Sequence, residues 1–218
     1  MTENSEIEGL PAKLLRFILR EPSLALTLSY LVLIIIGMVF SYHYYLNWGI
    51  DVFQYATISD FILAPFKDAI VLLFAIISIL LSWLVFEFSK KMDQRFPKLS
   101  KILWFGVKPG SSTYHNFYFS SLVFSFLYYL WLSSELFAGW KFGRMLKSKE
   151  NYAVEVLFHS QPEKGWVRFI QIGQLENFSL LAYPENNIVM VVPLEGNVAA
   201  IRIVSKASEN LNLKSSKQ

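Results

Sequence analysis

The sequence predicts an α-helical integral membrane protein with three transmembrane helices and a small C-terminal all-β barrel. Three apolar runs of roughly 20 residues each predict the helices, at residues 23–45, 69–88 and 117–138. Short alternating runs after residue 151 predict the barrel. We therefore expect four parts, namely an amphipathic lead-in (1–22), a transmembrane domain (23–148), a small β-barrel domain (149–206) and a flexible tail (207–218).

Each apolar run is long enough to cross a bilayer. A helix rises about 1.5 Å per residue, so about 20 residues cover a hydrocarbon layer of about 30 Å. Residues 31–40 (LVLIIIGMVF) and 70–81 (IVLLFAIISILL) are apolar on every side, whereas a helix at a water-exposed surface keeps a polar stripe. The chain is 54% hydrophobic and only 17% charged, against about 25% charged in an average soluble domain. We expect these helices to lie in lipid.

The composition excludes several classes of site. The net charge of +3 is small and the basic residues gather beside the apolar runs, so we expect membrane lipids as partners and no nucleic acid. The chain has no cysteine, which excludes disulfides, cysteine-based metal sites and a thiol nucleophile. The first run is longer than a signal-peptide core and ends in aromatic residues 42–45 (YHYY), so we expect it to stay on the protein as an anchor.

The distribution of Lys and Arg predicts the orientation, because these residues are retained on the cytoplasmic side. Nine basic residues lie before the first run or between the second and third runs, and five flank the runs on the opposite side, namely Lys67 and the four at residues 141–149. We expect a multi-pass protein of a bacterial inner membrane with a cytoplasmic N-terminus and a periplasmic C-terminal domain. A basic cluster at residues 141–149 (KFGRMLKSK) keeps the inverse topology open.

The lead-in has two opposed helical faces. Its apolar and basic side chains separate into Leu10, Leu14, Phe17 and Ile18 on one face and Lys13, Arg16 and Arg20 on the other. Such a segment either lies flat in the headgroup region or forms a solvated helix before Pro22. Pro22 suits the first turn of the spanning helix, where its missing N–H costs nothing.

The connection between the first two runs, residues 46–68, is too apolar for an ordinary loop. Its aromatic rings are typical of a membrane interface. A short amphipathic helix would place four side chains toward lipid, namely Ile58, Phe61, Ile62 and Pro65, with Ser59 and Asp60 as its cap. The segment is either a structural element at the interface or a loop whose carboxylates, Asp51 and Asp60, contact a ligand or partner.

The connection between the second and third runs, residues 89–116, is basic. Its cations alternate with apolar residues, which favours a short helix on an anionic leaflet. The candidate lipid or partner contacts here are Lys90, Lys91, Arg95, Lys98, Lys101 and Trp104. A docking site for a cytoplasmic partner and a segment that only sets topology both fit this pattern.

Polar residues are scarce within the three runs. Glu87 and Glu135 lie near the ends of the second and third runs, close to lysines, which suits interfacial pairing. The third region also carries small polar residues that commonly mark helix packing faces, namely Ser120, Ser121, Ser125, Ser133 and Ser134. A transporter would be expected to show internal repeats and midplane charges, and neither is visible in the sequence.

The C-terminal region alternates apolar and polar residues between turns. Five runs predict strands, at residues 152–159, 166–174, 178–183, 188–192 and 198–204. The breaks carry Pro, Gly and Asn, as in QPEKG at residues 161–165 and PLEGN at residues 193–197. Five strands in this length suit a small closed or partly closed barrel of SH3 or Sm type, because closure removes the exposed edges of the sheet.

The order of these parts resembles that of a group of uncharacterised bacterial inner-membrane proteins. The likeness rests on the aromatic connection at residues 45–68 (YLNWGIDVFQYATISDFILAPFKD) and on the strand, proline turn and strand at residues 187–204 (NIVMVVPLEGNVAAIRIV). It implies an architecture and no activity. A β module after three spans is also similar to small mechanosensitive channels, but the third run here is rich in aromatic residues where those channels have a Gly/Ala-rich pore helix.

The residue inventory argues against an enzyme. His43, His115 and His159 show no metal-ligand spacing. The sequence has no phosphate-binding glycine loop, no GxSxG elbow and no carboxylate pair that it places in a shared pocket. We expect no catalytic residue, no cofactor and no metal.

These observations favour a non-enzymatic membrane sensor or scaffold whose β module binds an envelope partner. One alternative is a homo-oligomeric channel, or the membrane subunit of a stress or phage-defence system, with serine-bearing third spans packed around an axis. Another is an immunity protein that shields the membrane from a toxin. A protein partner or a second copy of the chain is expected in each case.

Overall fold

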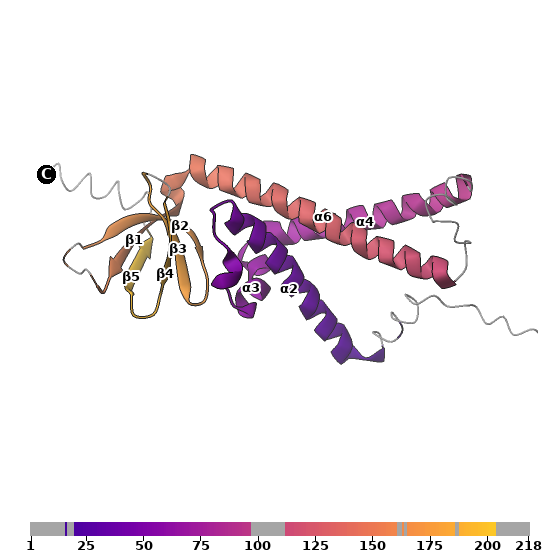
Figure 1. Ribbon diagram of the computed structural model, residues 1–218, viewed down its shortest axis with the longest axis horizontal. Coiled ribbons are helices and arrows are strands. Elements are labelled where there is room, and N and C mark those ends of the chain that lie inside the picture. The colour runs from indigo at the N-terminus through magenta and orange to yellow at the C-terminus, as the bar shows by residue number, and fades with distance from the viewer. Residues whose placement is uncertain are drawn as a thin grey trace, which may run out of the picture. The chain divides into compact units, whose positions relative to one another are not determined.

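The computed structural model describes residues 16, 20–96, 112–160, 163, 165–185 and 188–203 (Figure 1). Its helices are α2 (Pro22–Leu46), α3 (Ile58–Lys67), α4 (Ala69–Arg95) and α6 (Ser112–Lys147), with 3-10 turns η1 (Val52–Gln54) and η2 (Lys149–Tyr152). Its strands are β1 (Ala153–Phe158), β2 (Val167–Gln174), β3 (Phe178–Ala182), β4 (Val189–Pro193) and β5 (Val198–Ile203). The chain divides into two compact units, Met1–Val39 with Pro65–Ser134 and Phe40–Ala64 with Glu135–Gln218.

Three helices of the described chain are long and apolar enough to cross a membrane. Their spanning segments are Pro22–Leu46, Ala69–Ser89 and Phe119–Lys147, which confirms the three predicted apolar helices by length and composition. Asp68 caps the second of them, because its carboxylate accepts a hydrogen bond from the backbone N–H of Ile70 at 3.2 Å. Most of the predicted lead-in (1–22) and all of the predicted tail (207–218) lie outside the described residues.

Helices α4 and α6 contact each other through small polar side chains. The Ser78 hydroxyl lies 2.9 Å from the Ser133 hydroxyl and 3.2 Å from the backbone carbonyl of Tyr129. Ser82 donates to the carbonyl of Ser78 at 2.8 Å, and both side chains are fully buried. Small hydroxyl side chains let two helix backbones approach while their polar atoms stay satisfied. The predicted packing role is therefore confirmed for Ser133, whereas the side chains of Ser120 and Ser121 are exposed.

The strands form one antiparallel sheet in the order β4-β3-β2-β1-β5. Each observed strand lies within one residue of a predicted one at both ends. One face of the sheet carries a core to which all five strands contribute. Its buried members are Val154, Val156, Phe169, Leu181 and Val192, with Phe158, Val167, Met190, Val198 and Ile201 packed against them.

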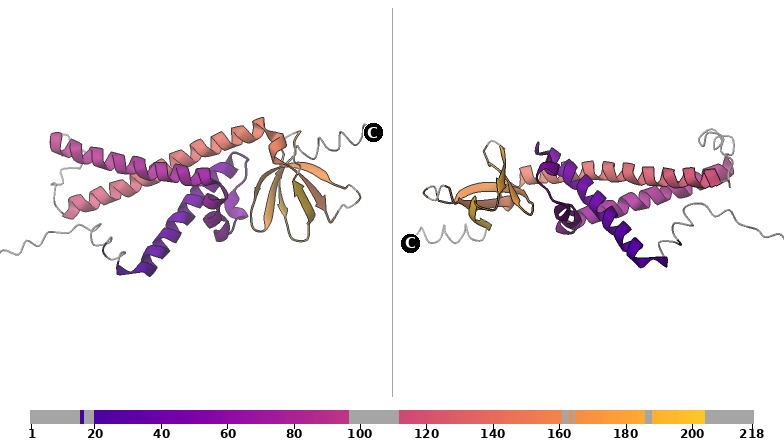
Figure 2. Two further views of the ribbon diagram at one scale, coloured as in Figure 1. Left: turned by 180° about the vertical axis from the view of Figure 1, so that it is seen from behind. Right: turned by 60° about the horizontal axis from the view of Figure 1, so that its bottom comes forward.

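The sheet is strongly curved. Pro193 ends β4 and Val198 begins β5, yet these residues occupy opposite corners of the sheet, four strand spacings or about 19 Å apart across a flat sheet. The five steps of chain between them reach at most about 18 Å, and a turn at Gly196 (φ 75°) shortens that reach. Curvature must therefore bring the corners together (Figure 2), and the backbone N–H of Val198 indeed bonds the carbonyl of Leu194, the residue after Pro193, at 3.4 Å.

The predicted small all-β domain is confirmed as a five-stranded antiparallel sheet, but this sheet is not closed into a barrel. In the described strands, β4 pairs only with β3 and β5 pairs only with β1. Closure requires the two edge strands to run side by side with a matched stagger. Here the edge strands are joined end to end by a connection of four residues, so they meet at a corner without forming a ladder.

A β-bulge receives the end of α2. The register of β2 against β3 shifts between Gln171 and Gly173, which leaves Ile172 as the extra residue outside the ladder. The Tyr44 hydroxyl donates a hydrogen bond of 2.8 Å to the carbonyl of Ile172 and lies 2.9 Å from the sulfur of Met145. Tyr45 packs so closely on Gly173 that a Cβ at that position would clash with the tyrosine hydroxyl. Two tyrosines of a predicted membrane helix therefore fasten it to the sheet.

Aromatic contacts extend this attachment within the same compact unit. Phe40 packs on Phe137 with ring centroids 5.5 Å apart, and Trp48 packs on Phe142 at 4.8 Å. Both partners lie on α6, which leads into the sheet. The Lys141 ammonium lies 4.6 Å from the centre of the Tyr44 ring, a cation-π geometry. The sheet is thus held by the end of α2 as well as by its covalent link to α6.

We predict that Gly173→Ala destabilises the folded protein. The added methyl group meets the hydroxyl of Tyr45 and, at 3.1 Å, two carbons of its buried ring, so the expected loss is about 1–3 kcal/mol. Intrinsic tryptophan fluorescence during denaturant unfolding of the detergent-solubilised protein measures the loss. Adding Tyr45→Phe should recover part of it, because the nearest atom is removed.

Gly143→Ala is the matched control. A Cβ at Gly143 has no neighbour within 4 Å, and alanine favours an α-helix over glycine by about 1 kcal/mol. This variant should be as stable as the parent protein or more so. Equal destabilisation by the two glycine substitutions would contradict the close packing of Tyr45 on β2.

Candidate functional site

Helix α3 begins at a carboxylate that the sequence singled out. Asp60 lies in the first turn of α3, and its side chain is buried. One carboxylate oxygen accepts hydrogen bonds of 3.1 Å from both the backbone N–H and the hydroxyl of Thr57, and the bond from the backbone N–H is one of the two that make up a capping box. The cap is therefore formed by Thr57 with Asp60, and the expected participation of Asp60 in it is confirmed.

The other carboxylate oxygen of Asp60 bonds the sheet. It accepts a hydrogen bond of 2.9 Å from the backbone N–H of Glu176, in the turn between β2 and β3. Ser59 and Thr57 donate to the carboxylate of Glu176 at 2.7 Å and 2.9 Å. These four residues, Thr57, Ser59, Asp60 and Glu176, are called the Asp60 cluster below. The cluster joins the connection between two predicted spans to a turn more than 100 residues later in the chain.

Hydrogen bonding also alters the acidity of Glu176. The Ser59 hydroxyl, and then the Thr57 hydroxyl, hold the pKa of the Glu176 carboxyl below its usual range, because both bonds favour the charged form. The side chain itself is exposed, so water screens this effect. The Asp60 cluster is therefore a structural contact with a titratable member, Glu176.

Asp51, the second predicted acidic contact, has a local role. It caps η1 by accepting from the backbone N–H of Phe53 at 3.2 Å, and it also accepts from the side-chain amide of Gln54 at 3.1 Å. Its side chain is exposed, in contrast to that of Asp60. The two predicted acidic contacts thus serve different turns of the same connection.

The basic candidates lie elsewhere in the chain. Lys91 and Arg95 are exposed in the last turns of α4, where cations favour the helix dipole. Lys90 belongs to the same helix, and its side chain is outside the described set. Lys98, Lys101 and Trp104 lie outside the described residues. Their expected role as lipid or partner contacts stays a prediction.

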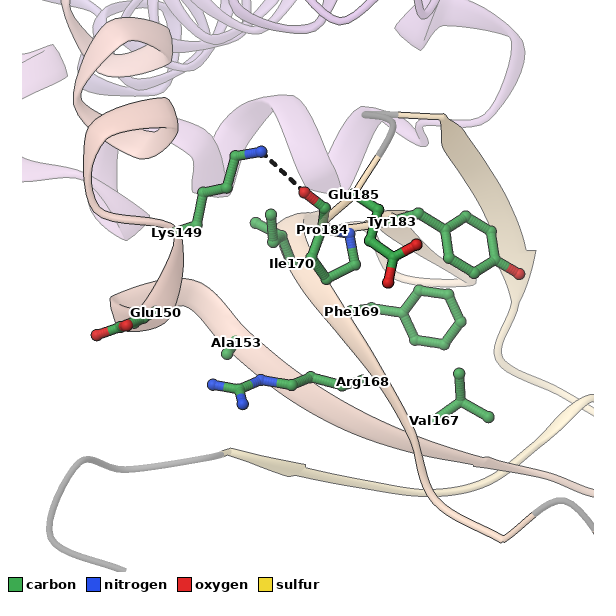
Figure 3. A pocket seen from close by; sticks show the side chains of 10 residues that line it. All are labelled: Lys149, Glu150, Ala153, Val167, Arg168, Phe169, Ile170, Tyr183, Pro184 and Glu185. Atoms are coloured by element: carbon green, nitrogen blue, oxygen red, sulfur yellow. Dashed lines mark hydrogen bonds between the residues drawn. The ribbon is translucent and has the colours of Figure 1, made fainter. Parts of the chain in front are cut away.

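A pocket of about 600 Å³ opens on the β domain, at residues that sequence reasoning did not select. Four elements line it: the connection from α6 at Lys149 and Glu150, β1 at Ala153, β2 at residues 167–170, and the turn after β3 at residues 183–185 (Figure 3). Its volume falls within the range of about 300–1,000 Å³ that is typical of ligand pockets.

The walls of the pocket are held in place by internal contacts. The Lys149 ammonium donates to the carbonyl of Pro184 at 2.9 Å, which ties the start of η2 to the turn after β3 (Figure 3). The Phe169 ring packs on the Tyr183 ring with centroids 4.9 Å apart. Phe169 is buried, whereas Tyr183 keeps 37% of its surface exposed. The partly exposed ring of Tyr183 therefore lies in a pocket wall whose position is fixed by these contacts.

The charges of the pocket are mixed. Lys149 and Arg168 supply two cations, and Glu150 and Glu185 supply two carboxylates, around a floor of apolar side chains. A ligand with one sign of charge would meet repulsion from part of this lining, since like charges within a few ångströms are unfavourable. A polypeptide segment that offers donors, acceptors and apolar side chains suits the lining better.

Among the described residues, no group of three or more His, Asp or Glu side chains could hold a metal ion.

The sequence held no usable signal for this pocket. Its charged members come from turns and strand starts that are far apart in the chain, and single Lys, Arg and Glu residues are common at such places.

The prediction of which side chains of the connection at residues 46–68 face lipid was partly wrong. Phe61 and Pro65, expected to face lipid, are buried in protein, whereas Ile58 is 65% exposed.

We predict that Asp60→Ala loosens the connection from the sheet. The substitution leaves the N–H groups of Thr57 and Glu176 without their acceptor, which costs about 1–3 kcal/mol for each group that stays buried. Hydrogen exchange of the detergent-solubilised protein should show the Glu176 amide exchanging about tenfold faster or more. Asp51→Ala, which removes an exposed cap, should leave exchange at Glu176 unchanged. Unaltered exchange in Asp60→Ala would contradict the bond between Asp60 and the turn.

We predict that acid weakens the same contact. The pKa of Glu176 is lower when the cluster is formed than when it is broken, so its stabilisation is present at neutral pH and is lost as the pH falls through that lowered pKa. The protection of the amides around Thr57, expressed relative to the intrinsic exchange rate at each pH, should therefore decrease at pH values below the ordinary pKa range of a glutamate. In Glu176→Gln this step should be weaker. An acid step of the same size in both proteins would assign it to another carboxylate.

Comparison of the chain with protein-family models, with curated proteins and with solved structures finds no match. The resemblance to bacterial inner-membrane proteins thus stays a prediction from the sequence. The function has to be argued from the pocket, the Asp60 cluster and the apolar helices.

Proposed function

We propose that the chain is a non-enzymatic integral membrane protein, a sensor or scaffold, whose β domain binds a segment of a partner protein in the pocket near Tyr183. The observation that carries this proposal is the pocket itself. It is braced, contains an exposed aromatic ring, and combines charges of both signs with an apolar floor. Exposed aromatic and Arg side chains are favoured anchors in protein interfaces.

Membrane residence is supported by the three helices. Each contains a segment long and apolar enough to cross a bilayer, and many of their large apolar side chains are exposed, such as Leu26 (73%) and Phe124 (72%). Such exposure is costly in water and favourable in lipid. With nine basic residues against five, the positive-inside rule favours a cytoplasmic N-terminus and a periplasmic β domain in a bacterial inner membrane.

The attachment of the sheet supports a sensing or scaffolding role. The ends of α2 and α6 belong to the same compact unit as the sheet, and Tyr44, Tyr45 and the Asp60 cluster fasten the chain around it. A partner bound in the pocket would contact η2 and β1, which follow α6 directly. Partner binding and the state of the helix end can therefore influence each other through short, bonded paths.

A photo-crosslinking amino acid at Tyr183 tests the proposal in the full-length protein in cells. We expect a discrete product with a second protein. In the Arg168→Gln background its yield should fall roughly tenfold, because a charged hydrogen-bond donor at an interface contributes about 1.5–3 kcal/mol. Lys147→Gln, which makes the same charge change outside the pocket lining, is the matched control and should keep the product.

A crosslinker at Glu195, in the turn between β4 and β5, controls for chance encounters. The same products from Glu195 and Tyr183, or products that contain only this chain, would contradict a partner site in the pocket. Loss of the product in both charge variants would also contradict it, since general electrostatic attraction would then explain the contact.

A further inference from the structure

Helix α3 has two faces of different environment, although both carry apolar residues. Residues advance about 100° around an α-helix, so Ile58, Ile62, Leu63 and Phe66 share an arc of about 140°. Three of them are exposed, Ile58 at 65%, Leu63 at 49% and Phe66 at 61%, and Ile62 is half-buried. The opposite arc holds the buried side chains of Asp60, Phe61 and Pro65. The helix therefore packs one face in protein and presents a second apolar face outward.

The rotation of α3 about its own axis is fixed at its N-terminal end. Asp60 bonds Thr57 and the N–H of Glu176 from the buried arc, and Phe61 packs on Phe53 with ring centroids 5.5 Å apart. A rotation of the helix that buried Leu63 would break these bonds and expose the buried carboxylate of Asp60. The apolar arc is thus held outward by polar contacts on the other side.

The position of α3 in the chain, between two candidate membrane spans, indicates which environment covers its outward apolar arc. Only Asp68 separates its last residue, Lys67, from α4, and α4 opens with the candidate span Ala69–Ser89. On the other side, eleven residues separate α3 from the candidate span that ends at Leu46. If both spans cross a bilayer, the ten residues between Ile58 and Lys67 are confined close to its surface. Neighbouring exposed rings agree with this position, since Phe53 stacks on Tyr42 at 5.7 Å and both are partly exposed.

We propose that α3 is an interfacial helix whose outward arc, Ile58, Ile62, Leu63 and Phe66, inserts into the boundary between lipid headgroups and acyl chains. The inference rests on the membrane residence proposed above. It assigns lipid as the occupant of this arc, while the opposite arc carries the Asp60 cluster that holds the sheet. The same ten residues thus contact the bilayer and the β domain.

Depth-dependent quenching tests the inference in the full-length protein. Because the chain has no cysteine, Leu63→Cys and Phe66→Cys each give a single site for an environment-sensitive fluorophore. The labelled protein is reconstituted into vesicles of phosphatidylethanolamine and phosphatidylglycerol. We expect lipids that carry a nitroxide near the headgroup to quench both positions at least about twice as strongly as lipids with a nitroxide deep in the acyl chain. Glu195→Cys, on the exposed turn between β4 and β5, should be quenched by water-soluble iodide and not by either lipid.

Each other outcome overturns the inference. Iodide quenching at Leu63 equal to that at Glu195 would place the arc in water. Protection of Leu63 from both iodide and nitroxide lipids would mean that protein, such as a second copy of the chain, covers it. Failure of the membrane residence itself is detected separately, because a protein that alkaline carbonate releases from the vesicles is not integral, whatever the label reports.

Discussion

The contact between the end of α2 and the bulge of β2 is the constraint on which the arrangement of the β domain depends. A bulge removes one residue from the ladder, and its carbonyl needs another donor when it is buried. The Tyr44 hydroxyl supplies that donor, and the missing side chain of Gly173 makes room for Tyr45. The bulge in β2 and the two tyrosines at the end of α2 are therefore complementary, since each provides a contact that the other needs.

The Asp60 cluster adds a second attachment with a different chemistry. The bulge contact is made by neutral and aromatic groups, whereas the cluster uses two carboxylates that accept hydrogen bonds from hydroxyl and backbone donors. Charged acceptors bind more strongly than neutral ones, and the lowered pKa of Glu176 makes its part of the contact dependent on pH. The connection between the first two apolar helices is thus fixed to the turn of the sheet by bonds that respond to solvent conditions, while the end of α2 is not dependent on them.

The sequence predicted the elements well and their contacts poorly, for physical reasons. Uninterrupted apolar runs and strict alternation locate helices and strands, because these patterns follow from the repeat of each element. They do not show which strands pair, so they could not decide whether β4 and β5 close the sheet into a barrel. They also cannot distinguish burial in protein from burial in lipid, since both environments are apolar, which explains the error at Phe61 and Pro65. The partner of Asp60 lies 116 residues away, and no local pattern reveals such a pair.

The open sheet has a consequence for assembly. A strand edge with unsatisfied backbone groups is a template on which another chain can extend the ladder, and long flat edges of this kind drive fibrous aggregation. Here both edges are short, at five residues in β4 and six in β5, and the curvature of the sheet keeps them from being flat. Pro193 also lacks the N–H that an added strand from another chain would need as a hydrogen-bond donor at the end of β4. The geometry that keeps the barrel from closing thus also discourages the addition of further strands, edge to edge, from other copies of the chain.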